Sequence, residues 1–268
     1  MLSATPSTAF RTRVLAGEML VGSFVNLGSA LTAEIMAICG FDWLVVDLEH
    51  GAGGEQEALA QIQAVAHTGA EALVRVEAVE RPRFGRVLDL GAAGVVVPRI
   101  RSVDDARRAV DSSRYSGSRG LAGYNRAWRW GLTAQEPSEV DAAIVCAVQI
   151  ETAEALSAAD EIAAVDGVDV LFVGPRDLGF ALGIRGGPEV PALKQRIAEV
   201  AQAASAHGKA AGILVGTLEQ AADYRDLGFS FLGCSSDSGL LAGESRRVAE
   251  GLRALKPEAE VVPLHAKE

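Results

Sequence analysis

Eight short runs of apolar residues, rich in Val and Ile, alternate with helical stretches along a chain of 268 residues. The runs are bounded mostly by Gly, Pro, Asp or Glu, as is typical of parallel strands that are buried on both faces. They cover residues 20–26, 43–48, 72–77, 94–100, 144–150, 170–174, 211–215 and 229–234. The predicted helices cover residues 31–39, 55–68, 82–90, 103–113, 152–162, 191–206, 218–227 and 239–255.

This alternation predicts an α/β fold, a single (β/α)8 TIM barrel over residues 1–256, for which about 250 residues is the usual length. An extra helix over Thr8–Leu15 is expected to close the lower end of the barrel, and residues 257–268 are expected to form a flexible tail. A doubly wound open sheet is the alternative fold. It normally has a Gly-rich phosphate-binding turn after its first strand, and the segment Asn26-Leu27-Gly28-Ser29 lacks that pattern.

The overall charge restricts the partners of the chain. A formal net charge of −10 and a pI of about 5.0 argue against a surface for nucleic acids or anionic membranes, which needs clustered Lys and Arg. No apolar run approaches the roughly 18 residues of a membrane span, and the first residues lack the pattern of a signal peptide. Cys39, Cys146 and Cys234 are widely spaced beside apolar segments, so buried, reduced thiols in the cytoplasm are expected.

Three ionisable residues end the second predicted strand, and in a TIM barrel the chemistry lies at the carboxyl ends of the strands. Asp47, Glu49 and His50 follow an apolar run, and Asp47 and Glu49 share a direction because side chains alternate along a strand. Asp47 and His50 are candidates for an Asp–His dyad that transfers protons, with Asp47 orienting the histidine. The alternative interpretation is a solvated loop with a helix cap.

Arg75 lies inside the third apolar run. A charged side chain in such a run must be paired with an opposite charge or reach the mouth of the barrel. Arg75 is therefore a candidate clamp for an oxyanion or a carboxylate of the substrate. The alternative is a structural salt bridge within the barrel, to Glu77 or Glu151.

The fifth and sixth predicted strands lead into carboxylates. Gln149 and Glu151 are two residues apart, so both point into the barrel if Val148 and Ile150 face the helices. Glu151 and Asp177 stand at neighbouring strand ends and can reach one cation. Two carboxylates without His or Cys neighbours favour a hard ion such as Mg²⁺ or Mn²⁺. The alternative is a helix cap at Asp177 and a salt bridge at Glu151.

The turn after the sixth strand is a second candidate for substrate binding. Gly174-Pro175-Arg176-Asp177 forms a tight turn into a helix, and its backbone N–H groups can hold a substrate carboxylate. Gly174, Pro175 and Arg176 are therefore predicted to bind the substrate.

An irregular stretch covers about residues 114–139 and is rich in arginine and aromatic residues. It is interpreted as a lid over an anionic substrate or as a protein interface. Its members include Arg114, Arg119, Tyr124, Arg126, Trp128, Arg129 and Trp130.

Several catalytic classes lack the residues that they need. None of the lysines, which are Lys194, Lys209, Lys256 and Lys267, ends a predicted strand, and this argues against a Schiff-base aldolase. The sequence also has no GxSxG serine elbow and no P-loop.

Five segments resemble the HpcH/HpaI aldolase family, in order within about residues 20–255. They are residues 40–51 (GFDWLVVDLEHG), Val97-Pro98, Arg119-Gly120, residues 148–152 (VQIET) and residues 173–178 (VGPRDL). The resemblance implies a barrel of the phosphoenolpyruvate/pyruvate type and a metal-dependent class II aldolase. Such an enzyme cleaves 4-hydroxy-2-oxo acids into pyruvate, or a related 2-oxo acid, and an aldehyde. The members most resembled act on 4-hydroxy-2-oxoheptanedioate and on 2-keto-3-deoxy-sugar acids.

The resemblance also implies roles for individual residues. Glu151 and Asp177 match the ligands of a divalent metal, which is Mg²⁺, Mn²⁺ or Co²⁺. His50 matches the catalytic histidine, with Asp47 beside it. Arg75 matches the arginine that steadies the enolate oxygen, and Gln149 matches a glutamine of the pocket. Arg176 departs from the family pattern, because many members have a small residue there; its side chain is expected to narrow the pocket or to grip an acidic acceptor. Members usually form hexamers in which neighbouring subunits exchange the C-terminal helix.

Three other functions compete with the aldolase. A CoA-thioester lyase of the citrate or malyl-CoA type needs a larger mouth and basic contacts for a nucleotide, which Arg176 and the arginine-rich stretch can offer. A lyase of phosphoenolpyruvate-like substrates is a further alternative. A non-catalytic binding protein predicts neither specific metal binding nor release of pyruvate.

Overall fold

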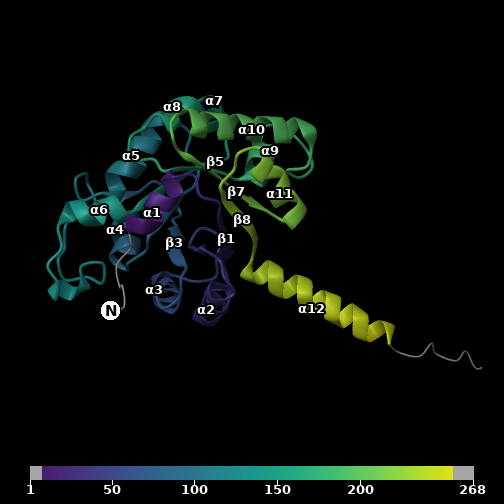
Figure 1. Cartoon of the computed structure of the whole chain (residues 1–268), viewed down its shortest axis with the longest axis horizontal. Helices are drawn as coiled ribbons and strands as arrows, with labels where there is room; N and C mark the ends of the chain where they lie inside the picture. The colour runs from purple at the N-terminus through teal and green to yellow at the C-terminus, as the bar shows by residue number, and fades with distance from the viewer. Residues whose placement is uncertain (1–7, 256–268) are drawn as a thin grey trace, which may run out of the picture.

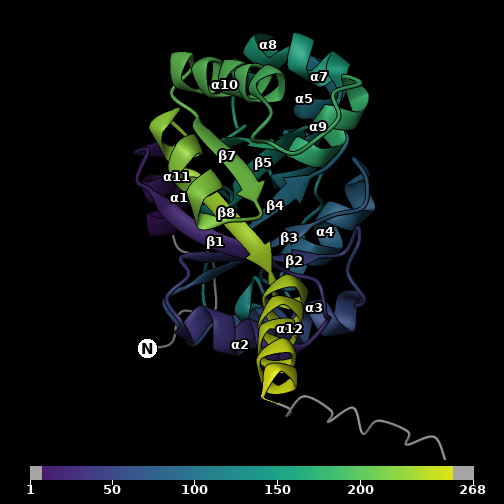
Figure 2. The same cartoon turned by 90° about the vertical axis from the view of Figure 1, so that its right-hand side faces the viewer.

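The chain folds into a closed barrel of eight parallel strands, in the order β1 to β8 around the barrel. The structure is a computed structural model that describes residues 8–255, and Figure 2 shows the strands with helices around them. The strands are β1 (Leu20–Val25), β2 (Trp43–Asp47), β3 (Glu71–Arg75), β4 (Gly94–Val97), β5 (Val145–Ile150), β6 (Val170–Val173), β7 (Ala210–Val215) and β8 (Phe231–Ser236). The predicted TIM barrel is confirmed, whereas the flexible tail predicted over residues 257–268 lies outside the described residues.

The helices around the barrel mostly match the predicted ranges. Those that match are α1 (Thr8–Leu15), α2 (Ala30–Ile38), α3 (Glu55–Val65), α4 (Arg81–Asp89), α5 (Val103–Ser113), α10 (Pro191–Ala206), α11 (Leu218–Asp226) and α12 (Asp237–Ala254). The helix predicted over residues 152–162 is two short helices, α7 (Ala153–Ser157) and α8 (Ala159–Ala163). The sequence did not predict α6 (Pro137–Ala143) or the 3-10 turn Arg129–Gly131, because segments this short do not display a helical period. The helix predicted to follow the turn at residues 174–177 is α9 (Pro175–Ala181).

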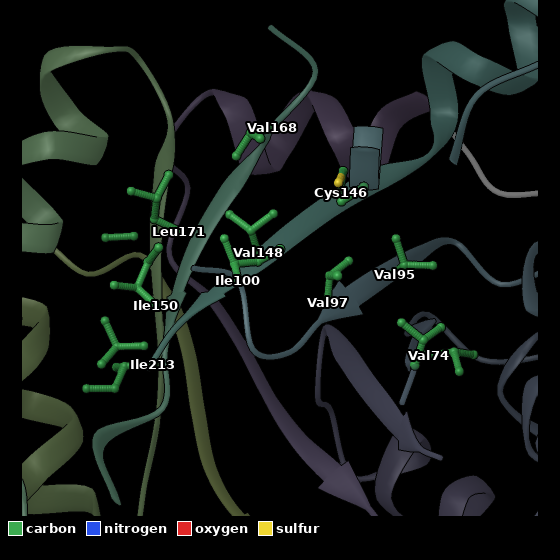
Figure 3. Close-up of a cluster of buried hydrophobic side chains, with 14 of the residues drawn as sticks. Val74, Val95, Val97, Ile100, Cys146, Val148, Ile150, Val168, Leu171 and Ile213 are labelled. Carbon is green, nitrogen blue, oxygen red and sulfur yellow. The ribbon is translucent and has the colours of Figure 1, made fainter. Parts of the chain in front are cut away.

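The alternation of side chains along the strands divides the core into two layers. Val148 and Ile150 of β5 point outward and pack beneath the helices, while the residues between them point into the barrel. Figure 3 shows this outer layer, in which valine, isoleucine and leucine side chains of several strands pack together. Gln149 therefore faces the barrel interior, as the sequence predicted.

Aromatic rings fill the inside of the barrel below its mouth. Trp43 is fully buried and stacks on Phe231, with the ring centroids 4.2 Å apart, and Phe172 packs edge-on against both rings. Gly22 makes room for the indole, because a Cβ at this position would lie 2.0 Å from the Trp43 ring. The interior is thus a packed core and not a channel.

Helix α1 closes the end of the barrel opposite the mouth, as predicted. Phe10 and Val14 of this helix join the inner aromatic cluster. Arg11 donates from Nη2 to Oδ1 of Asp169 at 2.8 Å, and the buried Asp169 carboxylate also accepts the backbone N–H of Cys146 at 2.9 Å. This contact ties α1 to the beginning of β5.

Helix α12 extends away from the barrel in both views (Figures 1 and 2). It begins where β8 ends, and its first residue, Asp237, is buried at 4% exposure. The Asp237 carboxylate accepts the backbone N–H of Asn26 at 2.9 Å and the hydroxyl of Thr32 at 2.9 Å. Beyond this anchor the apolar side chains of α12 are largely exposed. They are Leu240, Leu241, Val248 and Leu252, followed by Leu255.

Two further sequence predictions, on the eighth strand and on Cys39, differ from the structure. The eighth strand was predicted over residues 229–234 but covers Phe231–Ser236, because the polar Ser235 and Ser236 extend it beyond the apolar pattern. Cys39 was predicted to be buried but is exposed at the end of α2, whereas Cys146 is buried. No helix within residues 8–255 has the length and apolar character needed to cross a membrane.

Candidate active site

A cavity of about 650 Å³ opens at the carboxyl ends of the strands, where a TIM barrel carries its chemistry. Glu151 lies directly behind the cavity wall, because a Cβ on Gly174 would be 2.8 Å from its Oε2 atom. The structure therefore brings all of the predicted site residues to one place. Those that line the cavity are Asp47, His50, Arg75, Gln149, Gly174, Pro175, Arg176 and Asp177.

Arg75 is held by two carboxylates at the ends of β2 and β3. The strand register places it opposite Asp47, and its Nε and Nη2 atoms donate to the two Asp47 oxygens at 2.9 and 2.6 Å. Its Nη1 atom lies 3.3 Å from Oε2 of Glu49. Burial disfavours the charge, but the hydrogen bonds and charges of these partners raise the pKa of Arg75 above its ordinary value. The ion pairs that were considered from sequence, to Glu77 or Glu151, do not form.

The His50 ring is not oriented by Asp47, so the predicted side-chain dyad is wrong for this structure. Asp47 Oδ1 instead accepts the backbone N–H groups of Glu49 and His50 at 3.1 and 3.2 Å. The ring Nε2 of His50 lies 3.7 Å from Oε1 of Glu49, and the histidine side chain is 69% exposed. Asp47 therefore shapes the loop that carries His50, while Glu49 is the acidic neighbour of the ring.

Glu151 is the buried carboxylate of the site, at 6% exposure. Its Oε1 accepts the backbone N–H of Arg99 at 2.7 Å, and its Oε2 accepts from Nε2 of Gln149 at 3.0 Å. Burial raises the pKa of Glu151, and the charges of Asp177 and Glu49 raise it further. Asp177 approaches from the first turn of α9 and is exposed to the cavity.

This group of atoms fits a divalent cation. The negative charge of Asp177 raises the pKa of both Glu151 and Glu49, which burial already raises, and a cation relieves that cost of negative charge. The buried Oε1 atom of Gln149 accepts no hydrogen bond, so the site also has a free acceptor. No three His, Cys, Asp or Glu side chains within residues 8–255 converge closely enough to hold a metal by themselves. An ion bound by Glu151 and Asp177 would thus keep positions for water and substrate oxygens.

The sequence analysis noted that Glu49 shares the direction of Asp47 but assigned it no role, and it missed several residues that line the cavity. Among the missed residues, Ser235 carries no sequence signal: it adopts a left-handed backbone, with a φ of 60°, which is uncommon outside glycine and often marks functional sites. The remaining polar residues come from loops, from α11 and from the end of β8, and they are Asn26, Glu189, Gln220 and Ser236.

The arginine-rich stretch does not cover this cavity, so its interpretation as a lid is not supported. None of residues 114–136 lines the cavity. Arg114 donates to the carbonyl of Ile144 at 2.8 Å, and Arg119 pairs with Asp89 at 2.9 Å while its guanidinium lies 4.1 Å from the centre of the Tyr115 ring. Arg114 and Arg119 thus bind the arginine-rich stretch to α4 and to the beginning of β5.

The fold and the site define a TIM-barrel enzyme whose polar groups sit at the mouth of the barrel and include the buried carboxylate of Glu151. The family model described as HpcH/HpaI aldolase/citrate lyase matches residues 20–243. The chain therefore belongs to the HpcH/HpaI aldolase/citrate lyase family, and it is a carbon–carbon lyase.

Individual relatives agree with this assignment. A 2-dehydro-3,6-dideoxy-6-sulfogluconate aldolase of Pseudomonas putida is 36% identical over 89% of this chain and 95% of the relative. A 4-hydroxy-2-oxo-heptane-1,7-dioate aldolase of Salmonella arizonae is 37% identical over 92% of this chain and 93% of the relative. A solved structure of a family member from Burkholderia cenocepacia superposes with a TM-score of 0.88 at 34% identity, covering 92% of this chain and all of the other.

The comparisons support the aldolase prediction over the thioester-lyase alternative. A citrate lyase β subunit from Mycobacterium tuberculosis shares 20% identity with the chain and superposes with a TM-score of 0.56. That likeness shows the barrel fold alone. The two relatives from Pseudomonas putida and Salmonella arizonae, 36% and 37% identical to this chain, are both named as aldolases.

We predict that Gly174→Ala weakens metal binding by about 10-fold or more, a typical cost of disturbing a ligand's surroundings. The added Cβ would lie 2.8 Å from Oε2 of Glu151, so the carboxylate must move. Isothermal titration calorimetry with Mn²⁺ measures the change in the Kd for the metal. Gly216→Ala is the matched control, because Gly216 lines the same cavity and the nearest atom to its Cβ would be 3.6 Å away. Wild-type affinity in Gly174→Ala would exclude Glu151 as a ligand.

Proposed function

We propose that the protein is a divalent-metal-dependent aldolase. It reversibly cleaves 4-hydroxy-2-oxo acids into pyruvate, or a related 2-oxo acid, and an aldehyde. The observation that carries the proposal is that Arg75 and Asp177 line one cavity, with the buried carboxylate of Glu151 directly behind its wall at Gly174. The described lysines, Lys194 and Lys209, do not line this cavity, so an amine for a Schiff base is not at hand there.

Glu151 and Asp177 are the proposed metal ligands. When bound, the metal supplies Lewis-acid stabilisation of a negatively charged oxygen. Mg²⁺, Mn²⁺ and Co²⁺ all suit two carboxylates with open positions. The amide oxygen of Gln149 is buried and accepts no hydrogen bond. We propose that it accepts a hydrogen bond from a hydroxyl group of the bound substrate or from a water molecule beside it. Gly174 and Pro175 form the wall behind which Glu151 lies.

Arg75 is proposed to stabilise the oxygen at C2 of the substrate. Cleavage of the C3–C4 bond leaves its electron pair on the 2-oxo acid, where it is shared with the C2 oxygen as an enolate. Of the five N–H groups of the guanidinium, two bond to Asp47 and one points to Glu49, so two remain for the substrate. Because these partners already fix the guanidinium, it needs no rearrangement when the charge develops.

His50 is proposed to take the proton of the C4 hydroxyl as the C3–C4 bond breaks. Its ring lines the cavity and is exposed to it, with Glu49 as its acidic neighbour. The leaving fragment then becomes the aldehyde, and protonation at C3 gives the methyl group of pyruvate. Asp47 acts on this step by fixing the backbone of residues 49 and 50.

We further propose that the enzyme is a hexamer in which α12 packs on a neighbouring copy. The apolar side chains of α12 are exposed, with Leu241 at 59% and Leu252 at 62%. The neighbouring face of α2 exposes Leu31 and Ile35, at 70% and 62%. Exposed apolar surface of this extent is typical of protein–protein interfaces.

We also place the enzyme in the cytoplasm. Cys39, Cys146 and Cys234 are free thiols, as is usual in a reducing compartment. Recovery of the protein from the periplasm after cell fractionation would contradict this placement.

The proposed reaction predicts metal-dependent release of pyruvate from a racemic 4-hydroxy-2-oxo acid. Lactate dehydrogenase and NADH report the pyruvate as it forms. We expect release with Mg²⁺ or Mn²⁺, its loss on adding EDTA, and its return with excess metal. A folded, metal-binding protein that releases no pyruvate from several such acids would overturn the proposal.

Arg75→Ala is expected to lower kcat by about 100- to 1,000-fold, the usual cost of removing one donor to a developing oxyanion. The pyruvate assay measures this loss. Arg107→Ala is the control, because Arg107 is an exposed arginine of α5 paired with Asp104.

His50→Ala should lose cleavage while still binding Mn²⁺. Near-normal turnover of Arg75→Ala would remove its assigned role, and loss of Mn²⁺ binding in His50→Ala would make His50 a ligand.

Charges placed on α12 are expected to break the oligomer. Light scattering of the full chain should give about six times the mass of one chain, which is 27.9 kDa, and the Leu241→Glu, Leu252→Glu double variant should give a smaller particle. Glu250→Gln, a polar change on the same helix, is the control. A monomeric wild-type protein would contradict the hexamer.

A further inference from the structure

We propose that Arg176 forms a subsite for an anionic group at the far end of the acceptor aldehyde. The inference rests on the proposed aldolase function and names the class of its second substrate. The chemistry required is a carboxylate, sulfonate or phosphate a few bonds from the aldehyde carbon.

The two arginines of the cavity are in different electrostatic states. Arg75 has its charge balanced by Asp47 and Glu49 and is 14% exposed. Arg176 lines the same cavity and is exposed, and its side chain has neither a hydrogen bond nor an ion pair with any other residue in the range 8–255. A guanidinium whose five N–H donors are all unused, in a substrate cavity, is suited to bind an anion through two parallel hydrogen bonds, in a bidentate contact.

The position of Arg176 assigns it to the acceptor and not to the 2-oxo acid. It directly precedes Asp177, so the two Cα atoms lie about 3.8 Å apart, and both side chains line the cavity. The 2-oxo acid is proposed to sit against Glu151, Asp177 and Arg75. The aldehyde carbon must approach the C3 carbon to about 3–3.5 Å, which leaves groups further along the acceptor within reach of an arginine side chain.

The size of the cavity leaves room for such an acceptor. Its volume of about 650 Å³ lies well inside the range of about 300–1,000 Å³ that accommodates drug-sized ligands, whereas pyruvate has six non-hydrogen atoms. Glu189 and Gln220 line the same cavity. A short neutral aldehyde would leave part of this volume unfilled.

Glu189 lines the same cavity as Arg176 and has the opposite charge. Its carboxylate is held in place, because Oε1 accepts the backbone N–H of Gly187 at 3.2 Å and Oε2 accepts from Nε2 of Gln220 in α11 at 3.0 Å. An anionic group of the acceptor is attracted by Arg176 and repelled by Glu189, so it binds at Arg176.

The test compares acceptors that differ in charge, in the aldol direction with pyruvate and Mn²⁺. Succinic semialdehyde is paired with butanal, and glyceraldehyde 3-phosphate with glyceraldehyde. For the wild-type enzyme we expect kcat/KM to be about 10- to 100-fold higher for the charged member of at least one pair, the scale of a charge-assisted contact. The pair that shows the preference tells a carboxylate site from a phosphate site.

Arg176→Ala should abolish that preference by lowering kcat/KM for the charged aldehyde, and Arg176→Lys should restore part of it. Arg185→Ala is the matched control, because Arg185 is an exposed arginine just before the same loop that does not line the cavity. Equal losses for charged and neutral aldehydes in Arg176→Ala would show that the side chain only shapes the cavity. Equal losses of kcat/KM in Arg185→Ala and Arg176→Ala would show that the preference comes from the overall positive charge near the mouth and not from a contact with Arg176. Either result would overturn the inference.

Exchange of the methyl protons of pyruvate in D₂O separates this inference from the proposed function, because the exchange needs no acceptor. Wild-type enzyme that exchanges these protons with Mn²⁺ but prefers neutral aldehydes would refute the Arg176 subsite alone. Absence of both exchange and aldol products would refute the aldolase proposal itself.

Discussion

The ion pair between Asp47 and Arg75 sets the geometry of the mouth, because it joins β2 and β3 at the level where both strands end. Removing one member of a buried ion pair typically costs about 3–5 kcal/mol, since the other charge is left uncompensated. The same Asp47 carboxylate accepts backbone N–H groups of Glu49 and His50. One buried acid therefore fixes both the guanidinium that faces the 2-oxo acid and the loop that carries the histidine.

The framework of the site could be predicted from sequence because it depends on local periodicity. A buried parallel strand is an apolar run that ends abruptly in polar residues, and this pattern located the ends of β2, β3, β5 and β6. The period of two along β5 was sufficient to place Gln149 inside the barrel, and Figure 3 shows Val148 and Ile150 on the outer face. The metal and catalytic roles of these residues stay predictions.

The partners of each side chain could not be predicted, because they depend on the register between strands and on loop conformation. Glu77 is much nearer to Arg75 along the sequence than Asp47 is, and only the alignment of β3 with β2 selects Asp47 as its partner. Whether Asp47 would meet the ring or the backbone of His50 depended on the turn that follows β2. Ser235 and Ser236 entered the cavity through an extension of β8 that carries no apolar signal.

The aromatic filling of the barrel also determines the order of events in the proposed reaction. Trp43, Phe172 and Phe231 occupy the interior, and α1 covers the opposite end, so ligands enter and leave the cavity at one mouth. In the proposed arrangement the 2-oxo acid lies deepest, against Glu151, and the acceptor lies between it and the solvent. That arrangement requires the aldehyde to depart before pyruvate in cleavage, and pyruvate to bind first in synthesis. By closing the other end of the barrel, the packing of three buried rings thus makes the proposed reaction an ordered one.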